Sequence, residues 1–268
     1  MDGSVAIDAS TVAEITELSS TGHDLEPWIS SDGLRIYFSR DLAPAGHGDI
    51  YFASRGSPTG MFAAATPVTN LNTGGQEGRA WLTSDELAIA LSTTHDGPLN
   101  INMNTRAAGQ RFGTPDNGHL AMVNATGSQH YDPFLTDDLL RLYFSANTGP
   151  SSKLELWLAT RSTAADDFDP PSRVPGINDS SLNEFGAALY QGERLLVYNA
   201  APNGDTFELW YATRSTATGS FGNPAKIPTV NSGFDELDPV LSADGCELYL
   251  ASRRVGGKYH LFRARVTP

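Results

Sequence analysis

Ionisable side chains recur at two fixed positions in five segments of this 268-residue sequence. The first position holds Asp24, Glu77, His130, Glu184 and Glu236. The second position, two residues later, holds Glu26, Arg79, Asp132, Gly186 and Asp238. Carboxyl groups that face one another can act as a general acid and a general base. Together with an imidazole they can also bind a divalent cation, so the pattern predicts one of these chemistries if the fold gathers the five segments.

Three sets of site residues follow from this pattern. The predicted catalytic acids and bases are Glu77, Asp132 and Glu184. The residues expected to contact a small polar ligand are Asp24, Glu26, Arg79, Tyr131 and Asp238. The predicted ligands of one divalent cation, Ca²⁺, Mn²⁺ or Zn²⁺, are His130, Glu77, Glu184 and Glu236.

A ring of carboxylates is costly unless something neutralises it. A bound cation, an ion pair with Arg79 or protonation of some carboxyl groups would each do so. The structural alternative is that these acids accept hydrogen bonds from backbone amides and brace neighbouring repeats. Trp28, Trp81 and Phe134 also share one position, and we expect them to pack between repeats, although tryptophan near a channel could stack on a sugar.

The segments belong to a repeat that covers almost the whole chain. Strand-like runs that end in arginine are DIYFASR, NINMNTR, LELWLATR, FELWYATR and YHLFRAR, and their arginines are Arg55, Arg106, Arg161, Arg214 and Arg265. The intervals between these arginines are 51, 55, 53 and 51 residues. Four of the copies continue into a run that ends in asparagine, at Asn72, Asn124, Asn178 and Asn231. We expect the five arginines to be structural, since a single site rarely needs five equal copies.

Four short antiparallel strands per repeat, named A to D in chain order, are typical of a β-propeller blade. The sequence therefore predicts an all-β domain of five blades, at about 24–75, 76–127, 128–181, 182–233 and 234–268. The fifth copy lacks strand D, whereas the segment 13–20 looks like a strand D without a blade of its own. We predict that this N-terminal strand completes the last blade and closes the ring, because closure removes exposed sheet edges. Strand A then lines a central channel, and the D-to-A connections gather the ionisable residues at one face.

The repeat resembles the bacterial WD40-like PD40 repeat of the TolB propeller family. The residues that carry the resemblance are EPWISSDGLRIYFSR, from Glu26, and DIYFASR, which ends at Arg55. The second copy departs from the pattern with Ala80 and Glu86, and the fourth begins with Gly186. The resemblance covers essentially the whole chain and implies a propeller of the bacterial envelope, periplasmic or secreted. It leaves function open, because such propellers serve as scaffolds, ligand binders and carbohydrate-processing domains.

The amino-acid composition excludes some classes of binding partner. The net charge of −13 disfavours nucleic acid, and no apolar run is long enough to insert in a membrane. The single cysteine, Cys246, lies in the run CELYLAS, so we expect a small buried side chain rather than a nucleophile. No local motif of nucleotide binding, of zinc hydrolysis or of a nucleophilic serine is present, so any active site must be assembled from several blades.

Three functions remain open. The first is a ligand-binding or partner-binding propeller with an acidic funnel, able to hold a metal ion, at the face of the D-to-A connections. The alternative is a metal-dependent or acid/base enzyme, of the glycoside hydrolase or lyase kind, acting on a carbohydrate or small polar substrate. A third is a module that docks a protein partner through its acidic face.

Overall fold

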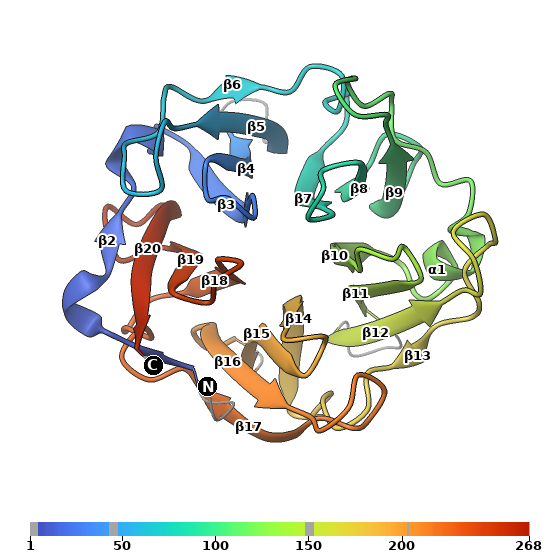
Figure 1. Cartoon of the computed structure of the whole chain (residues 1–268). Coiled ribbons are helices and arrows are strands. Elements are labelled where there is room, and N and C mark those ends of the chain that lie inside the picture. Colours follow the sequence, from blue (N-terminus) through green and yellow to red (C-terminus); the bar gives the residue numbers. More distant parts are fainter. Residues whose placement is uncertain (1–4, 43–47, 148–152, 203, 268) are drawn as a thin grey trace.

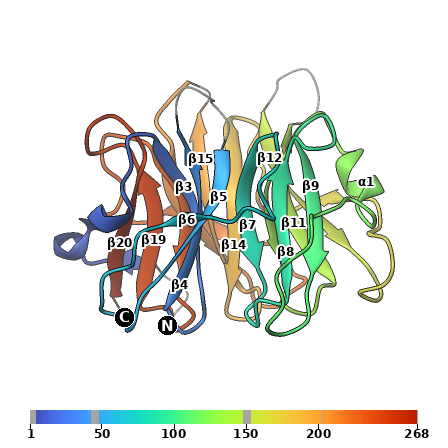
Figure 2. The same ribbon diagram turned by 90° about the horizontal axis from the view of Figure 1, so that it is seen from above.

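The computed structural model describes residues 5–42, 48–147, 153–202 and 204–267. Five antiparallel sheets stand around a central axis, which confirms the predicted five-bladed β-propeller (Figure 1). The first strand of each sheet lies nearest the axis, and the strands run between the two faces of the disc (Figure 2). Within the described residues, no helix has the length and apolar character needed to cross a membrane.

The strands follow the repeat. Blade 1 consists of β3 (His23–Ile29), β4 (Arg35–Asp41), β5 (Gly48–Ser54) and β6 (Thr66–Pro67). Blade 2 consists of β7 (Glu77–Leu82), β8 (Ala88–Thr93) and β9 (Asn100–Thr105). Blade 3 consists of β10 (His130–Leu135), β11 (Arg141–Asn147), β12 (Leu154–Thr160) and β13 (Ser172–Arg173). Blade 4 consists of β14 (Leu182–Tyr190), β15 (Leu195–Pro202), β16 (Glu208–Thr213) and β17 (Gly222–Lys226). Blade 5 contains β18 (Glu236–Leu241), β19 (Glu247–Ser252) and β20 (His260–Thr267).

The burial of the second strand of each blade shows how the sheets pack against one another. Its residues are mostly buried, as in β8, because a neighbouring blade covers each face of the sheet. The third strand instead alternates between buried and partly exposed residues, as in β12. Buried apolar side chains from all five blades consequently form one continuous core.

The N-terminal segment closes the ring, as predicted. Strands β1 (Ala6–Ile7) and β2 (Ala13–Glu14) both pair antiparallel with β20 of the last blade. The predicted strand over 13–20 is shorter in the structure, because β2 gives way to a 3₁₀ turn (Thr16–Leu18). This turn buries Leu18, which a continued strand at the blade edge would leave less covered.

Blade 2 departs from the prediction of four strands. The described part of this blade has three strands, followed by a single bridge between Met103 and Asp116 and a short helix, α1 (Ala121–Asn124). The run predicted as strand D buries Leu120 and Val123, which are three residues apart and therefore favour a helical turn.

The recurring asparagines bond to strand C at the outer edge of four blades in the same way. Each side-chain amide accepts from the backbone N–H of one residue of strand C and donates to the carbonyl of that same residue. The pairs are Asn72 with Ile50, Asn124 with Ile101, Asn178 with Leu156 and Asn231 with Leu209, at 2.7 to 3.1 Å. The asparagine thus substitutes for a ladder bond where strand D is short or absent.

Four of the strand-end arginines have the expected structural role. Each donates through Nε to a backbone carbonyl of the A-to-B turn of its own blade, and each guanidinium lies over a phenylalanine ring. The arginines are Arg55, Arg106, Arg161 and Arg214, with Nε···O distances of 2.6 to 2.7 Å. The fifth, Arg265, is exposed at the closing strand.

The expectation of a buried cysteine is wrong. Cys246 is exposed, because it belongs to the A-to-B turn of blade 5 and not to the strand that follows. Its backbone N–H donates to Asp244 Oδ1, which fixes the turn and leaves the thiol outside the sheet.

Closure can be tested at Leu18. This side chain is 1% exposed, whereas Leu42 is 38% exposed. We expect Leu18→Ala to lower the free energy of unfolding by about 3 kcal/mol, because it removes packing between the N-terminal segment and the last blade. Urea denaturation followed by tryptophan fluorescence measures this, with Leu42→Ala as the control expected to change little. Equal effects of the two substitutions would show that the N-terminal segment does not stabilise the ring.

Candidate functional site

The second ionisable position is a left-handed bulge in each inner strand. The φ angles are positive at this position, and the register of the inner strand against its neighbour shifts there in every blade. The residues are Glu26 (56°), Arg79 (41°), Asp132 (53°), Gly186 (68°) and Asp238 (56°). A bulge of this kind redirects the side chain, and here it brings residues of different blades together at the axis.

Arg79 spans the axis. Its Nη1 lies 3.2 Å from Asp238 Oδ1, and its Nη2 donates to the carbonyl of Gly186 at 3.4 Å. These partners belong to blades 5 and 4, whereas Arg79 belongs to blade 2, so the contacts cross the channel. Arg79 is only 1% exposed. Glycine is required at 186 because a Cβ there would lie 2.6 Å from Asn199 Oδ1.

The remaining members bond to their neighbours around the axis. Glu26 Oε2 accepts from the backbone N–H of Arg79 at 2.5 Å and from Ser39 Oγ at 2.6 Å. The backbone N–H of Glu26 donates to Asp238 Oδ2 at 3.1 Å. Asp132 accepts from Ser145 Oγ at 3.4 Å. We call Glu26, Arg79, Asp132 and Asp238 the axial ring.

Protonation of carboxyl groups in the axial ring offsets negative charge that Arg79 alone does not neutralise. Burial raises the pKa of Asp132 to about 6 and that of Asp238 to about 8. The Arg79 guanidinium opposes both shifts, and the carboxylate of Glu26 reinforces them. Two of the three predicted ways of neutralising the ring, pairing with Arg79 and protonation, therefore operate together.

The first ionisable position does not reach the axis. Asp24, Glu77 and Glu236 each accept a hydrogen bond from the backbone N–H of the residue four positions earlier, at 2.9 to 3.0 Å. Glu77 also accepts from Thr93 Oγ1 at 3.0 Å, and Glu236 pairs with Arg254 at 3.0 Å. These acids cap the D-to-A connections, as the structural alternative expected.

The predicted metal ligands remain in separate blades. His130 Nδ1 lies 3.2 Å from Asn100 Oδ1 of blade 2, and Glu77 and Glu236 are held by the contacts above. Among the described residues, no three His, Cys, Asp or Glu side chains are grouped so as to hold a metal ion. The cluster of His130, Glu77, Glu184 and Glu236 thus does not assemble.

The predicted catalytic and ligand-binding sets are divided in the same way. Asp132 lies in the axial ring, whereas Glu77 caps its D-to-A connection and Glu184 is buried apart from the ring. Of the predicted ligand contacts, Glu26, Arg79 and Asp238 are in the ring, and Asp24 is not. The hydroxyl of Tyr131 donates to Gln129 Oε1 at 2.6 Å, close to the surface.

Glu184 is a buried acid without a full set of partners. It is 3% exposed, and its Oε2 accepts no hydrogen bond from the described residues. Burial raises the pKa of Glu184 to about 8, so this carboxyl group is largely protonated at neutral pH.

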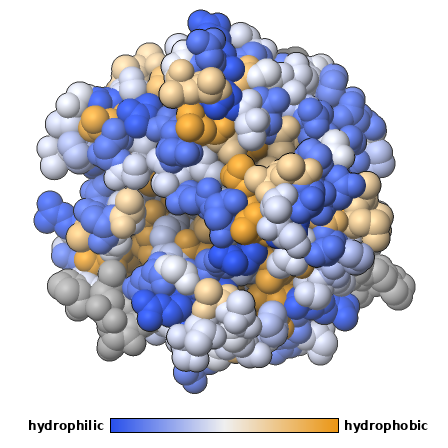
Figure 3. Space-filling view, turned by 45° about the vertical axis from the view of Figure 1, so that its right-hand side comes forward, coloured by the Kyte–Doolittle hydropathy of each residue, from blue (hydrophilic) through white to orange (hydrophobic). Residues whose placement is uncertain are grey.

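A cavity of about 480 Å³ opens at the other end of the axis. Its rim consists of the A-to-B turns, and its wall consists of the second halves of the inner strands. The apolar wall contains Trp28, Trp81, Phe134, Leu189, Tyr190 and Val240, and the polar rim contains Ser31, Ser84, Asp137, Arg141, Gln191 and Glu193. In Figure 3, which turns the view of Figure 1, hydrophobic residues reach the surface towards the middle of the molecule, among hydrophilic ones. We call this the axial cavity.

The aromatic wall is rigidly held. Trp28 donates through Nε1 to the carbonyl of Leu82 in the next blade at 2.9 Å, and the rings of Trp81 and Phe134 lie 4.5 Å apart. These residues pack between blades, as expected, and their edges also face the cavity. Sequence reasoning placed the site at the opposite face, although the shared register of the three aromatic residues was a signal for this one.

Comparison with known proteins identifies the fold. No family model matches the chain, and no curated protein matches it. Among solved structures, the catalytic domain of the Coprinopsis cinerea GH62 alpha-L-arabinofuranosidase has a TM-score of 0.65 at 14% identity, covering 98% of this chain and 96% of that one. RS223-beta-xylosidase has a TM-score of 0.63 at 14% identity, covering 97% and 98%.

TolB is also among the structural neighbours. TolB from Acinetobacter baumannii has a TM-score of 0.54 at 14% identity, over 94% of this chain, which spans 56% of the TolB length. At these identities the likenesses show a shared propeller fold alone. The resemblance to the PD40 repeat in particular stays a prediction.

The axial ring can be tested by removing its cation. Arg79→Met leaves three buried or half-buried carboxyl groups without a positive partner, so we expect a loss of about 3–5 kcal/mol in the free energy of unfolding at pH 8. The loss should be smaller at pH 5, because protonated carboxyl groups no longer repel one another. Urea denaturation at the two pH values measures this, with exposed Arg111→Met as the control. An equal loss at both pH values would show that packing, not charge, is what Arg79 contributes.

Glu184→Gln should stabilise the protein in alkaline conditions. The pKa of about 8 exceeds the ordinary value of 4.5, so the folded state binds more protons between these values and the wild-type free energy of unfolding falls as pH rises through this window. We expect the variant to gain on the order of 1–3 kcal/mol at pH 8 and almost nothing at pH 4.5. Thermal melting across this pH range measures the difference, with Glu208→Gln, which breaks a surface pair with Lys226, as the control. A gain that does not vary with pH would contradict the assignment.

Proposed function

We propose that the protein is a ligand-binding propeller whose site is the axial cavity and whose ligand is a neutral polyhydroxylated molecule, such as a short carbohydrate. The observation that carries the proposal is the composition of that cavity, an aromatic wall below a polar rim. Its volume of about 480 Å³ lies in the range of pockets that bind small ligands.

The chemistry of the lining selects the ligand class. A sugar ring has an apolar face of C–H groups and an edge of hydroxyl groups. The first can pack on Trp81 and Phe134, and the second can bond to Gln191, Arg141 and other groups of the rim. Anionic ligands are disfavoured by the carboxylates of the rim and by the net charge of −13.

The proposal also includes a location in the cell. The resemblance to the TolB family supports a periplasmic or secreted protein of the bacterial envelope. A xylosidase and an arabinofuranosidase share the fold, which supports a carbohydrate as the ligand. A small polar ligand is favoured over a protein partner because the axial cavity is concave and narrow.

A second candidate function is acid/base catalysis by the axial ring. The observation that favours it is the pair of raised pKa values, about 6 for Asp132 and about 8 for Asp238, close to the half-buried carboxylate of Glu26. A carboxyl group whose pKa is raised by burial can act as a general acid beside an ionised carboxylate. The ion pair with Arg79 counts against it, because the guanidinium occupies the place beside Asp238 that a substrate would need.

Titration with xylotriose and cellotriose tests the binding proposal. We expect a saturable change in tryptophan fluorescence, because Trp28 and Trp81 face the cavity. Trp81→Leu and Gln191→Ala should each weaken binding about tenfold, a loss of about 1.4 kcal/mol. Trp157→Leu, on the third strand of blade 3, is the matched control and should bind as the wild type does.

Two results would overturn the binding proposal. One is that neither a neutral oligosaccharide of this size nor a wider set of neutral glycans binds. The other is that binding survives both cavity substitutions. Hydrolysis of aryl glycosides that is lost in Glu26→Gln would instead establish the second candidate function.

A further inference from the structure

The blade junctions share a polar motif in which a buried arginine meets a hydroxyl group. Arg214 Nη2 donates to the hydroxyl of Tyr143 in the preceding blade at 2.9 Å, and that hydroxyl donates to Glu193 Oε2 at 2.7 Å. Arg55 Nη2 donates to Tyr249 at 2.9 Å, and Tyr249 donates to Glu247 at 2.7 Å. A guanidinium, a hydroxyl and a carboxylate therefore form one chain of hydrogen bonds at both junctions.

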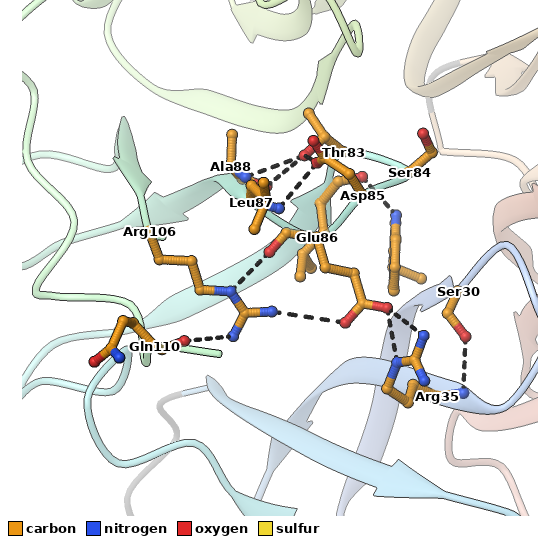
Figure 4. Close-up of polar contacts among 12 residues, drawn as sticks. Ser30, Arg35, Thr83, Ser84, Asp85, Glu86, Leu87, Ala88, Arg106 and Gln110 are labelled. Carbon is orange, nitrogen blue, oxygen red and sulfur yellow. Dashed lines mark hydrogen bonds and ion pairs between the residues drawn. The ribbon is translucent and has the colours of Figure 1, made fainter. Parts of the chain in front are cut away.

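At the junction of blades 1 and 2, the partner of the strand-end arginine, Arg106, is a carboxylate. Figure 4 shows Glu86 between two guanidinium groups, with its oxygens 2.7 Å from Arg35 and 3.7 Å from Arg106. Arg106 also donates to the carbonyls of Glu86 and Gln110. At each of these three junctions, Nη2 of the strand-end arginine therefore has a partner, either a tyrosine hydroxyl or a carboxylate.

Arg161, at the junction of blades 2 and 3, lacks this partner. It is 7% exposed, and it donates through Nε to the carbonyl of Leu139 at 2.7 Å and through Nη1 to that of Asp166 at 3.1 Å. In the described part of the chain, its Nη2 has no hydrogen-bond or ion-pair partner. Burial lowers the pKa of Arg161, in keeping with a charge that is incompletely compensated.

The missing partner results from two substitutions in the repeat. Ala90 lies opposite Trp81 in the register that places Tyr143 opposite Phe134. Leu139 takes the turn position of Glu86, and both have positive φ. Blade 2 therefore contributes no tyrosine hydroxyl at the position of Ala90, and blade 3 contributes no carboxylate at the position of Leu139.

A cavity of about 350 Å³ lies at this junction. Arg161 lines it, together with Met103, Leu120 and Leu139, which are apolar, and with Asp116 and His119. The cavity is separate from the axial cavity, since the two share no lining residue. It offers a guanidinium donor and a carboxylate acceptor on an apolar wall, which are the groups that surround Tyr143 and Tyr249 at the complete junctions.

We propose that this cavity binds a small uncharged phenol, which takes the place of the tyrosine that blade 2 lacks. The phenol oxygen accepts from Arg161 Nη2 and its hydroxyl donates to Asp116, while the ring packs on Met103 and Leu139. A neutral phenol is favoured over an aromatic carboxylate, because Asp116 lines the cavity and Asp166 and Asp167 carry charge close to Arg161. The hydroxyl group is worth roughly two- to tenfold in affinity, as expected for one hydrogen bond of about 0.5–1.5 kcal/mol.

Binding of p-cresol, the side chain of tyrosine, tests the proposal on the intact protein. Titration followed by amide chemical shifts should show saturable binding at residues of this junction, about fivefold tighter than binding of toluene and tighter than binding of benzoate. Ala164→Phe should abolish it, because Ala164 is an exposed residue that lines the cavity. Ala217→Phe is the matched control, since it makes the same change in the next blade, where Tyr143 already occupies the junction.

Any of three results would overturn the proposal. One is no saturable p-cresol binding up to its solubility limit. Another is equal binding of toluene and p-cresol. The third is unchanged binding in an Ala164→Phe variant whose melting temperature matches that of the wild type.

Asp116→Asn supplies an independent check, because loss of the charged acceptor should reduce the preference for p-cresol over toluene. Trp81→Leu should leave p-cresol binding intact, which separates this site from the axial cavity.

Discussion

Each inner strand passes through a left-handed residue near its middle, and these residues from five blades meet at the axis. Positive φ costs energy for any residue but glycine, so it persists at Glu26, Arg79, Asp132 and Asp238 only because surrounding contacts hold it. The bulge concentrates three carboxyl groups in a narrow space. The pairing with Arg79 and the raised pKa values of Asp132 and Asp238 offset part of that charge.

The axial ring also divides the molecule functionally. On the side of the D-to-A connections, the acids of the first position are committed to capping their own loops. On the side of the A-to-B turns, the inner strands carry aromatic residues and enclose the axial cavity. In the proposed function, a ligand would therefore meet the apolar wall from the side of the A-to-B turns, and the acidic composition of the chain would disfavour anionic ligands.

The sequence predicted the architecture well, because a period of about 53 residues and alternating hydrophobicity depend on the backbone repeat. It did not predict where the acids point, since a single bulge at Glu26 reverses the direction that simple alternation gives. One signal was available for the capping role. A serine or threonine lies four residues before every first-position residue, for example Ser20 before Asp24 and Thr73 before Glu77. The axial cavity was missed because sequence does not show at which end of a channel the side chains leave a cavity.

Departures from the repeat are where a propeller gains individual chemistry. Residues that recur in most blades, such as the strand-end arginines and the asparagines of the outer edge, bond to backbone and build the blades. Arg79 stands where three of the other blades have an acid, and it is the one cation of the axial ring. Ala90 stands where three of the other blades have tyrosine, and Leu139 stands where two have glutamate, and the guanidinium of Arg161 lines a cavity. Arg161 keeps the contacts of the other strand-end arginines through Nε and Nη1, and Nη2, which these contacts leave without a partner in the described residues, is the group to which an occupant of the cavity would bond.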